Sequence, residues 1–243
     1  MLTQYRMTLE SDRPMRFAPE WGYRLYSALL ERGPASFAER VHADGITPVS
    51  QFLTPGSRPV WTVNLLGEAC ERELGPLLED ISRLSLERDG VQLRITEKTC
   101  RRIGDVDELF AAAESLADGC RLRVCTPAAF KSRGRYQTLP TPELVIQNLV
   151  RKWNGCITEC PIEDTDGEGV AALADGLRWK SFDLRSEHYR LKGNAIPGFV
   201  GTLAVERESD GFHGQLTDAL LLFSSYSGLG IKTALGMGGI RLE

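Results

Sequence analysis

Long apolar runs are missing from this sequence of 243 residues. The longest apolar stretches, such as 219–223, fall far below the roughly 18 residues that a membrane span requires. We therefore expect no transmembrane helix and no membrane partner. The first 20 residues hold six charged side chains and no continuous apolar segment, so we expect no secretory signal and predict a cytoplasmic location.

Histidine is scarce, and cysteine lacks the spacing of a zinc finger. The three imidazoles, His42, His188 and His213, are the only candidates for histidine acid/base chemistry, which an ordinary pKa of about 6.5 favours near neutral pH. In a cytoplasmic protein the six cysteines are expected to be reduced thiols. Two cysteine pairs, at positions 120 and 125 and at 156 and 160, lack a second pair of ligands in finger spacing. We therefore predict no metal site and no cofactor.

A strong excess of one charge is also absent, since 29 Lys and Arg stand against 33 Asp and Glu. A net charge of −4 by itself argues against a polyanionic partner. However, residues 121–160 hold seven basic and two acidic side chains, whereas residues 68–119 hold seven and 13. Five of the basic residues follow one another with no carboxylate between them: Arg121, Arg123, Lys131, Arg133 and Arg135. Because local potential decides where a polyanion docks, this stretch is a candidate nucleic-acid surface, with a solvated loop as the alternative.

The apolar periodicity predicts a mixture of strands and helices. Residues 4–9 alternate polar and apolar side chains, which is the period of a half-buried strand. From Trp21 an apolar stripe at helical spacing leads to the stop signal Gly33-Pro34, and Thr141 followed by proline and glutamate opens another helix that stops at Gly155. Further strands are predicted around Phe52 and at 60–66, 91–95, 121–125, 177–184, 189–192, 198–206 and 239–242, and further helices at 37–41, 76–86, 107–116 (capped by Asp107) and 216–223.

The order of these elements in the second half repeats the order in the first. Two split βαβ units explain this order without long structureless loops. The predicted fold class is therefore α+β, with two tandem ferredoxin-like (βαββαβ, RRM-like) domains at residues 1–119 and 120–243.

The most specific local feature is the glycine-rich segment 228–239, between the last predicted helix and the last predicted strand. Glycines let a backbone pass close to a ligand, their free N–H groups can hold an anionic backbone, and Lys232 adds a positive charge. The spacing is not that of a Walker loop, and the segment does not open a helix as a dinucleotide fingerprint does. A tight turn from helix to strand is the structural alternative.

This segment resembles the glycine-rich signature of the CRISPR-associated RAMP endoribonucleases of the Cas6 family, which process precursor CRISPR RNA. Further segments resemble that family in the same order along the chain: the first helix at 25–30, the loop from His42 to Pro48, residues 126–131 with 139–140 and 153–154, and residues 191–193 with 197–201. The resemblance covers most of the chain except the acidic stretch 68–119.

The resemblance implies a metal-independent endoribonuclease that cleaves CRISPR repeat RNA in precursor transcripts to give guide RNA. In this chemistry the 2′-OH attacks the adjacent phosphate and leaves a 2′,3′-cyclic phosphate and a 5′-OH. The implied catalytic residues are His42 in its loop and a second group on the first helix, whose identity varies within the family. Tyr26 and Ser27 are the candidates for it, with Tyr23 as a further alternative. No lysine follows His42 within ten residues, so the cationic stabiliser is unassigned.

The same resemblance implies an RNA partner and not DNA. The residues expected to hold the RNA are Lys131, Arg133, Arg135, Lys192, Gly228, Gly230, Lys232, Gly236 and Gly238. Other CRISPR effector subunits and a second copy of the chain are additional candidate partners. Because a fold does not determine a function, two other hypotheses stay open: a non-catalytic CRISPR RNA-binding RAMP subunit and, less favoured, a nucleotide-binding enzyme.

Overall fold

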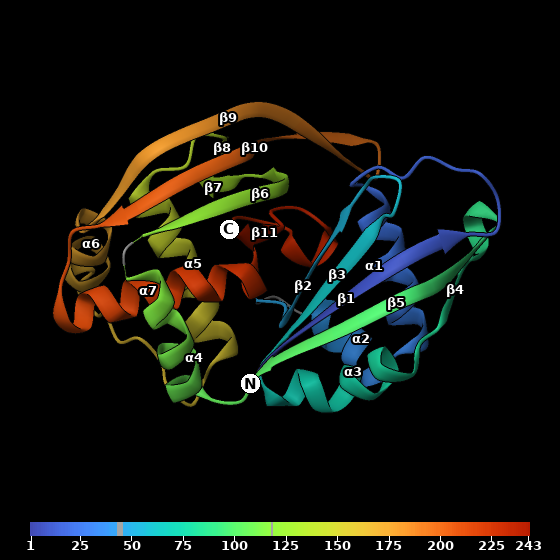
Figure 1. Cartoon of the computed structure of the whole chain (residues 1–243), viewed down its shortest axis with the longest axis horizontal. Helices are drawn as coiled ribbons and strands as arrows, with labels where there is room; N and C mark the ends of the chain where they lie inside the picture. The colour runs from blue at the N-terminus through green and yellow to red at the C-terminus, as the bar shows by residue number, and fades with distance from the viewer. Residues whose placement is uncertain (43–45, 118) are drawn as a thin grey trace.

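Two antiparallel sheets lie side by side along the long axis of the molecule (Figure 1). The computed structural model describes residues 1–42, 46–117 and 119–243, with the exception of the side chains at 38 and 40–42. The first sheet holds β1 (Leu2–Ser11), β2 (Val49–Thr54), β3 (Val60–Leu66), β4 (Arg83–Leu86) and β5 (Val91–Ile103). The helices of this half are α1 (Trp21–Arg32), α2 (Ala35–His42) and α3 (Glu68–Asp80), with the short 3-10 helix η1 (Glu87–Asp89).

The second sheet and its helices come from the rest of the chain. Its strands are β6 (Cys120–Ala128), β9 (Leu177–Leu191), β10 (Asn194–Arg207) and β11 (Ile240–Leu242), and a separate hairpin holds β7 (Phe130–Ser132) and β8 (Arg135–Gln137). The helices are α4 (Val106–Ala113), α5 (Pro142–Cys156), α6 (Glu168–Asp175) and α7 (Gly211–Ser227), with the short η2 (Glu114–Leu116) and η3 (Thr233–Leu235).

The strand order in both sheets is that of a ferredoxin-like unit. The first sheet reads β2-β3-β1-β5-β4 and the second reads β11-β6-β10-β9. In each, the first strand lies between the strand that closes the unit and the third strand of the unit, with antiparallel pairing throughout. The predicted α+β fold with tandem ferredoxin-like units is confirmed. The boundary between residues 119 and 120 stays a prediction.

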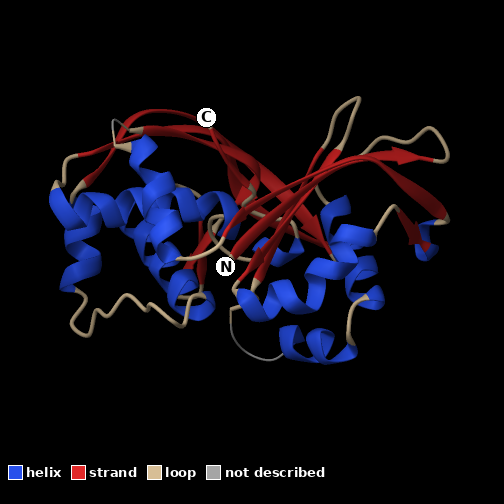
Figure 2. Cartoon of the chain, turned by 60° about the horizontal axis from the view of Figure 1, so that its bottom comes forward, coloured by secondary structure: helices blue, strands red, loops and turns tan. Residues whose placement is uncertain are grey.

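Helices cover one face of each sheet (Figure 2). The C-terminal end of α7 also packs against the opposite face of the first sheet, where the Ser50 hydroxyl donates to Tyr226 O. In β1 the residues Tyr5, Met7 and Leu9 are buried under the helices, as their alternation predicts. The second core forms around Trp153 and Phe223, whose rings meet edge to face, and it also includes Leu109 of α4. Burial of such aromatic and aliphatic side chains is the main source of stability for both halves.

The helix predicted at 76–86 is wrong, because the chain is helical over Glu68–Asp80 and forms β4 at Arg83–Leu86. The apolar stripe that packs α3 into the core begins at Cys70, before the proline that we expected to open the helix. The strands predicted at 177–184 and 189–192 are one strand, β9.

Two smaller assignments also change. Asp105, and not Asp107, caps α4, since its carboxylate accepts the N–H of Glu108 at 2.8 Å. His213, which its place between Gly211 and Gly214 led us to expect in a glycine-rich turn, lies in the first turn of α7. Cys100, Cys120, Cys125, Cys156 and Cys160 are free thiols, as expected, and no helix among the described residues is long and apolar enough to cross a membrane.

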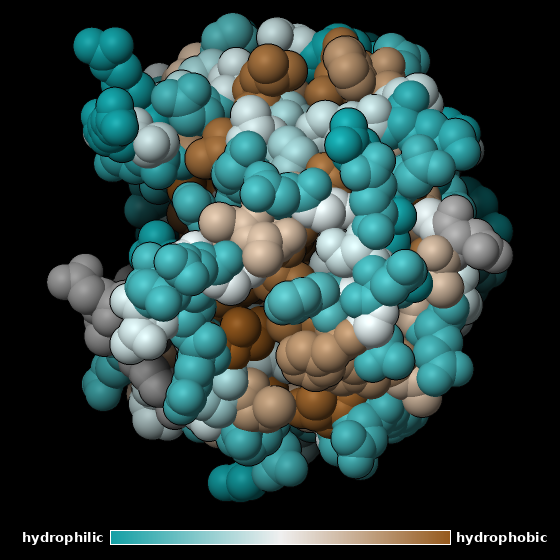
Figure 3. Space-filling view, turned by 90° about the vertical axis from the view of Figure 1, so that its left-hand side faces the viewer, coloured by the Kyte–Doolittle hydropathy of each residue, from teal (hydrophilic) through white to brown (hydrophobic). Residues whose placement is uncertain are grey.

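The outer end of the second half has a mostly hydrophilic surface in which small groups of hydrophobic side chains are scattered (Figure 3). The large hydrophobic side chains that the second half leaves exposed include Leu139, Phe182 and Phe212. Single exposed hydrophobic side chains of this kind are normal for a globular protein.

Candidate functional site

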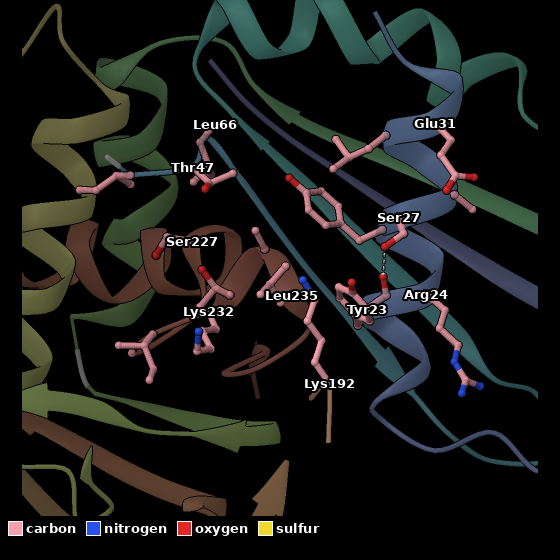
Figure 4. Close-up of a pocket in the computed structure, with 18 of the residues that line it drawn as sticks. Tyr23, Arg24, Ser27, Glu31, Thr47, Leu66, Lys192, Ser227, Lys232 and Leu235 are labelled. Atoms are coloured by element: carbon pink, nitrogen blue, oxygen red, sulfur yellow. Dashed lines mark hydrogen bonds between the residues drawn. The ribbon is translucent and has the colours of Figure 1, made fainter. Parts of the chain in front are cut away.

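A cleft of about 1170 Å³ opens between the two halves (Figure 4). One wall is α1, and the opposite side is built from α5 and from the glycine-rich segment. The lining residues that carry chemistry are Tyr23, Arg24, Tyr26, Ser27, Glu31, Arg151, Lys152, Lys192 and Lys232. These residues come from segments that are far apart in the sequence, around 23–31, 151–152, 192 and 232, and the fold brings the segments to one surface.

On the α1 side, Tyr26 and Ser27 both line the cleft. The Ser27 hydroxyl donates to the carbonyl of Tyr23, one turn earlier, at 3.1 Å. Tyr26 is buried, with an exposed fraction of 3 %. Its hydroxyl has no hydrogen-bond partner in the part of the chain that the structure describes. Burial raises the pKa of Tyr26, so the phenol stays protonated and able to donate.

Two lysines face this wall from the second half. Lys192, in the turn between β9 and β10, holds its ammonium over the ring of Tyr23 at 5.4 Å from the centroid. Lys232 is exposed within the glycine-rich segment. Figure 4 shows both side chains in the cleft, to the left of α1. Three predicted RNA-binding residues, Lys192, Gly230 and Lys232, therefore share one cleft with Tyr26 and Ser27, two predicted catalytic residues.

The glycine-rich segment is a tightly packed structure with little free N–H capacity. Gly228, Gly230, Gly236 and Gly238 all have positive φ angles and are all buried. Their N–H groups donate, in the same order, to Ser224 O, Asn148 Oδ1, Thr233 O and Pro127 O. The expectation that these N–H groups are free for an anionic backbone is therefore corrected: the protein itself uses them. Of the four glycines, Gly230 lines the cleft.

Close backbone contact explains the need for glycine in this segment. A Cβ at Gly230 would lie 2.2 Å from the carbonyl oxygen of Ala129, and one at Gly236 would lie 2.3 Å from the hydroxyl of Tyr189. Real Cβ atoms essentially never come this close to another heavy atom. Positive φ angles add a second reason, since only glycine adopts them at no cost.

Lys152 on α5 lies behind the glycine-rich segment. Its ammonium donates to Ser227 O at 3.0 Å, to Gly228 O at 2.9 Å and to Thr233 Oγ1 at 3.4 Å. Burial lowers the pKa of Lys152 to about 7, because a charged group is costly away from water. The sequence analysis counted this lysine only as part of a basic stretch. Its spacing of seven from Val145 on the buried face of α5 is the signal that was available.

A buried amide joins the first half to the same segment. The Gln51 side chain donates to Gly22 O on α1 and to Ala234 O in η3, both at 3.0 Å. Its oxygen accepts the indole N–H of Trp61 at 2.9 Å. Gln51 carries no local sequence signal of this role, because a glutamine in a strand usually faces solvent.

The basic cluster at Lys131, Arg133 and Arg135 forms the β7–β8 hairpin and not a loop. All three side chains are exposed, and none lines the cleft. Arg133 and Gly134 at the tip have φ angles of 48° and 76°, which suit a tight hairpin turn. The structure thus places Lys192, Gly230 and Lys232 in the cleft and Lys131, Arg133 and Arg135 on this hairpin, whereas Gly228, Gly236 and Gly238 are buried away from both.

His42 is the last residue of α2, and its side chain, with residues 43–45, lies outside the described residues. The description resumes at Ile46, and Ile46 and Thr47 line the cleft. His188 on β9 and His213 on α7 are exposed and do not line it. Among the described residues, no group of three or more His, Cys, Asp or Glu side chains is arranged to hold a metal ion.

The sequence model of the CRISPR-associated endoribonuclease Cas6 family matches residues 122–240, from β6 to β11. The second half of this chain is therefore similar to the Cas6 family. The match spans the second sheet, the β7–β8 hairpin, Lys152 and the whole glycine-rich segment.

Full-length Cas6 proteins align with the rest of the chain as well. The CRISPR-associated endoribonuclease Cas6 of Mycobacterium tuberculosis (strain CDC 1551 / Oshkosh) is 28% identical over 251 residues, which is 100% of this chain and 78% of that protein. The Streptococcus thermophilus Cas6 is 26% identical over 229 residues, 93% of both proteins. A solved structure described as a Cas6 product complex has a TM-score of 0.75 at 24% identity and covers 100% of this chain and 99% of that one, which shows the shared fold.

Proposed function

We propose that this chain is a metal-independent endoribonuclease that cleaves CRISPR repeat RNA in precursor transcripts at the cleft between its two halves. One observation carries the proposal: Tyr26 on α1, Lys232 in the glycine-rich segment and Ile46, where the described chain resumes after His42, all line the same cleft. A hydroxyl group and a cation therefore line one cleft.

The proposed reaction uses the substrate's own ribose. His42 acts as acid/base group and takes the proton of the 2′-OH, whose oxygen forms a bond to the adjacent phosphorus. The bond from phosphorus to the 5′-oxygen then breaks, and that oxygen takes up a proton. The products are a 2′,3′-cyclic phosphate and a 5′-OH.

The other groups stabilise charge. The phosphate gains negative charge as the 2′-oxygen attacks, and cationic groups placed beforehand lower the barrier of such a step. Lys232 and Lys192 are the proposed cations. They would take the role of cationic stabiliser, for which no lysine is present within ten residues after His42. The protonated Tyr26 hydroxyl, which lacks a partner within the described structure, is the proposed donor to the phosphate or to the leaving oxygen. Ser27 is the second candidate on that helix turn.

The β7–β8 hairpin is the proposed second contact with the RNA. Lys131, Arg133 and Arg135 are exposed on it, and no carboxylate separates them in the sequence. Proteins bind RNA stems mainly by shape and phosphate contacts and unpaired bases by their edges. Exposed arginines and lysines on a hairpin fit phosphate contacts.

The testing experiment incubates the protein with the repeat RNA of its own CRISPR array. We expect cleavage at one site, undiminished in EDTA, with a 2′,3′-cyclic phosphate upstream and a 5′-OH downstream. A repeat with a single 2′-deoxy nucleotide 5′ of the cut should bind and stay intact. Cleavage of the deoxy repeat, or a 5′-phosphate product that depends on Mg²⁺, would overturn the mechanism. Tight binding without cleavage of any repeat would favour the non-catalytic RNA-binding subunit.

A further inference from the structure

Lys152 is a buried cation that the proposed reaction does not use. The residue is 7 % exposed, and its three hydrogen-bond acceptors are two main-chain carbonyls and a threonine hydroxyl. No carboxylate is among these partners. Burying a lysine ammonium without a carboxylate partner costs free energy, which suggests that Lys152 has a function at this position.

The acceptors lie on both sides of the exposed part of the glycine-rich segment. Ser227 is the last residue of α7, and Gly228 follows it, so the ammonium meets the carbonyl end of a helix, where the helix dipole favours a cation. Thr233 lies directly after Lys232. The Lys152 ammonium therefore ties the start of the segment to its far side, and the residues between them include the cleft-lining Gly230 and Lys232.

We propose that Lys152 is a positioning residue whose protonated ammonium holds residues 228–233 in the shape that presents Lys232 to RNA, so that RNA binding at the cleft is coupled to proton uptake by Lys152. The inference rests on the proposed function, because repeat RNA is taken as the ligand.

The coupling follows from the number of donors. An ammonium has three N–H groups for the three acceptors, whereas a neutral amine has two. Near neutral pH the free protein is a mixture of both forms, since burial brings the pKa of Lys152 to about 7. An RNA phosphate in the cleft favours the charged form, so the pKa rises on binding, and by linkage a higher pH weakens binding.

The other titratable and charged groups around Lys152 are Cys156 and the charged residues that line the cleft. Cys156, one turn later on α5, stays a neutral thiol because burial raises its pKa to about 12. The charged residues that line the same cleft are Arg24, Glu31, Glu87, Arg88, Asp89, Arg151, Lys192 and Lys232. Of these, Arg24 and Asp89 pair with each other at 3.1 Å. None of the group shares a described hydrogen bond with the Lys152 ammonium.

The chain offers a matched control in Lys98. Its ammonium also donates to three main-chain carbonyls, those of Leu78, Glu79 and Ile81, each at 2.7 Å, at the end of α3 and outside the cleft. Replacing either lysine by methionine removes a similar set of hydrogen bonds. Only Lys152→Met removes them from the glycine-rich segment.

The experiment is a calorimetric titration of each protein with repeat RNA that carries the single 2′-deoxy nucleotide, at about pH 7.5, in two buffers of different ionisation enthalpy. We expect wild type and Lys98→Met to take up a measurable fraction of a proton on binding, and Lys152→Met to lose that fraction. Between about pH 6.5 and 8.5 the affinity of wild type should fall about 5- to 10-fold, a typical size for such coupling, and that of Lys152→Met should fall less.

Two further measurements guard against a Lys152→Met variant that does not fold. In wild type with ¹³C-labelled lysine, the Lys152 signal should titrate near pH 7 and move to higher pH when the same RNA is added. In Thr233→Val, which removes one acceptor and keeps the charge, the midpoint should move to lower pH. Equal proton uptake in Lys152→Met, or a Lys152 signal that RNA does not move, would overturn this inference while leaving the proposed function intact. Wild-type protein that binds no repeat RNA would overturn both.

Discussion

Asn148 on α5 accepts the backbone N–H of Gly230 through its side-chain oxygen at 2.8 Å. Lys152 lies one turn later on the same helix and donates to the carbonyls of Ser227 and Gly228. One face of α5 therefore shapes the glycine-rich segment from two points. The segment reaches the cleft already folded, which lowers the entropy cost of binding a ligand there.

His42→Ala is expected to lower the cleavage rate by a factor on the order of 10² or more, because one acid/base group typically contributes that much. Affinity for the 2′-deoxy repeat should stay within a few fold of wild type. Single-turnover cleavage and a binding titration measure the two quantities. A variant that cuts at the wild-type rate would remove His42 from the mechanism.

Tyr26→Phe separates chemistry from stability. Its hydroxyl has no partner among the described residues, so its removal should leave the free energy of unfolding unchanged or slightly higher. The cleavage rate should fall about 10-fold or more if the hydroxyl donates in the transition state. Ser27→Ala should have a smaller effect on the rate, since the Ser27 hydrogen already goes to Tyr23 O. Unchanged cleavage by Tyr26→Phe would exclude Tyr26 as a catalytic residue.

Lys232→Ala should weaken RNA binding and reduce the slope of log K against log salt by about one unit, as the loss of one phosphate contact does. Preference among repeat sequences should persist. Lys180→Ala is the control, because Lys180 on β9 is paired with Glu206 at 3.7 Å and lies outside the cleft. Equal slopes for Lys232→Ala and wild type would place Lys232 off the RNA.

Gly236→Ala should destabilise the fold by about 1–3 kcal/mol or more, as strained φ values and overpacking do. The new Cβ would lie 2.3 Å from the Tyr189 hydroxyl, which donates to Leu235 O at 2.7 Å. Gly90→Ala is the matched control: its φ is also positive, at 60°, but the added Cβ meets open space. Urea unfolding of both variants separates strain from the clash. Equal losses for the two would show that the contact with Tyr189 relaxes freely.

Stability of the RNA-free protein should rise with pH between about 7 and 8.5. Below about pH 7, Lys152 is protonated in both the folded and the unfolded chain, and the folded chain bears the full cost of burying the charge. Above it the folded chain releases the proton that the unfolded chain keeps, so the free energy of unfolding increases by up to about 1.4 kcal/mol per pH unit. Cys120 and Cys156 lower the free energy of unfolding at higher pH, because burial raises the pKa of their thiols and only the unfolded chain releases those protons there. In urea unfolding, the increase in the free energy of unfolding with pH should be present in wild type and absent in Lys152→Met. The same increase in Lys152→Met would show that another group causes it.

Much of the fold could be predicted from the sequence, because periodicity and caps are local signals. The alternation of residues 4–9 predicts β1, and Thr141 accepts the N–H of Leu144 as a helix cap, as its sequence context predicts. The end of β5 gave no such signal. From Thr96 to Arg102 its side chains are polar or partly exposed on both faces, and only pairing with β1 makes this stretch a strand.

The site was harder to predict, because it depends on contacts between distant segments. Lys232 and Lys192 could be proposed as cations from their place in family-like motifs. The hydrogen-bond partners of Lys152 lie 75 or more residues away in the sequence. Those of Gln51 lie 29 or more residues away, except for Trp61. No local sequence pattern therefore predicts these hydrogen bonds. The internal use of the glycine N–H groups likewise follows only from tertiary packing.

β9 ends the second sheet and leaves one side of a strand of 15 residues without a neighbouring strand in the sheets that the structure describes. Charged side chains recur along it, at Arg178, Lys180, Asp183, Arg185 and Arg190, and all five are exposed. Charge on an open edge opposes pairing with another chain. A second copy of the chain, one of the candidate partners, is therefore not expected to bind by extending this sheet at β9. The same charges oppose aggregation through this edge, the longest among the described strands.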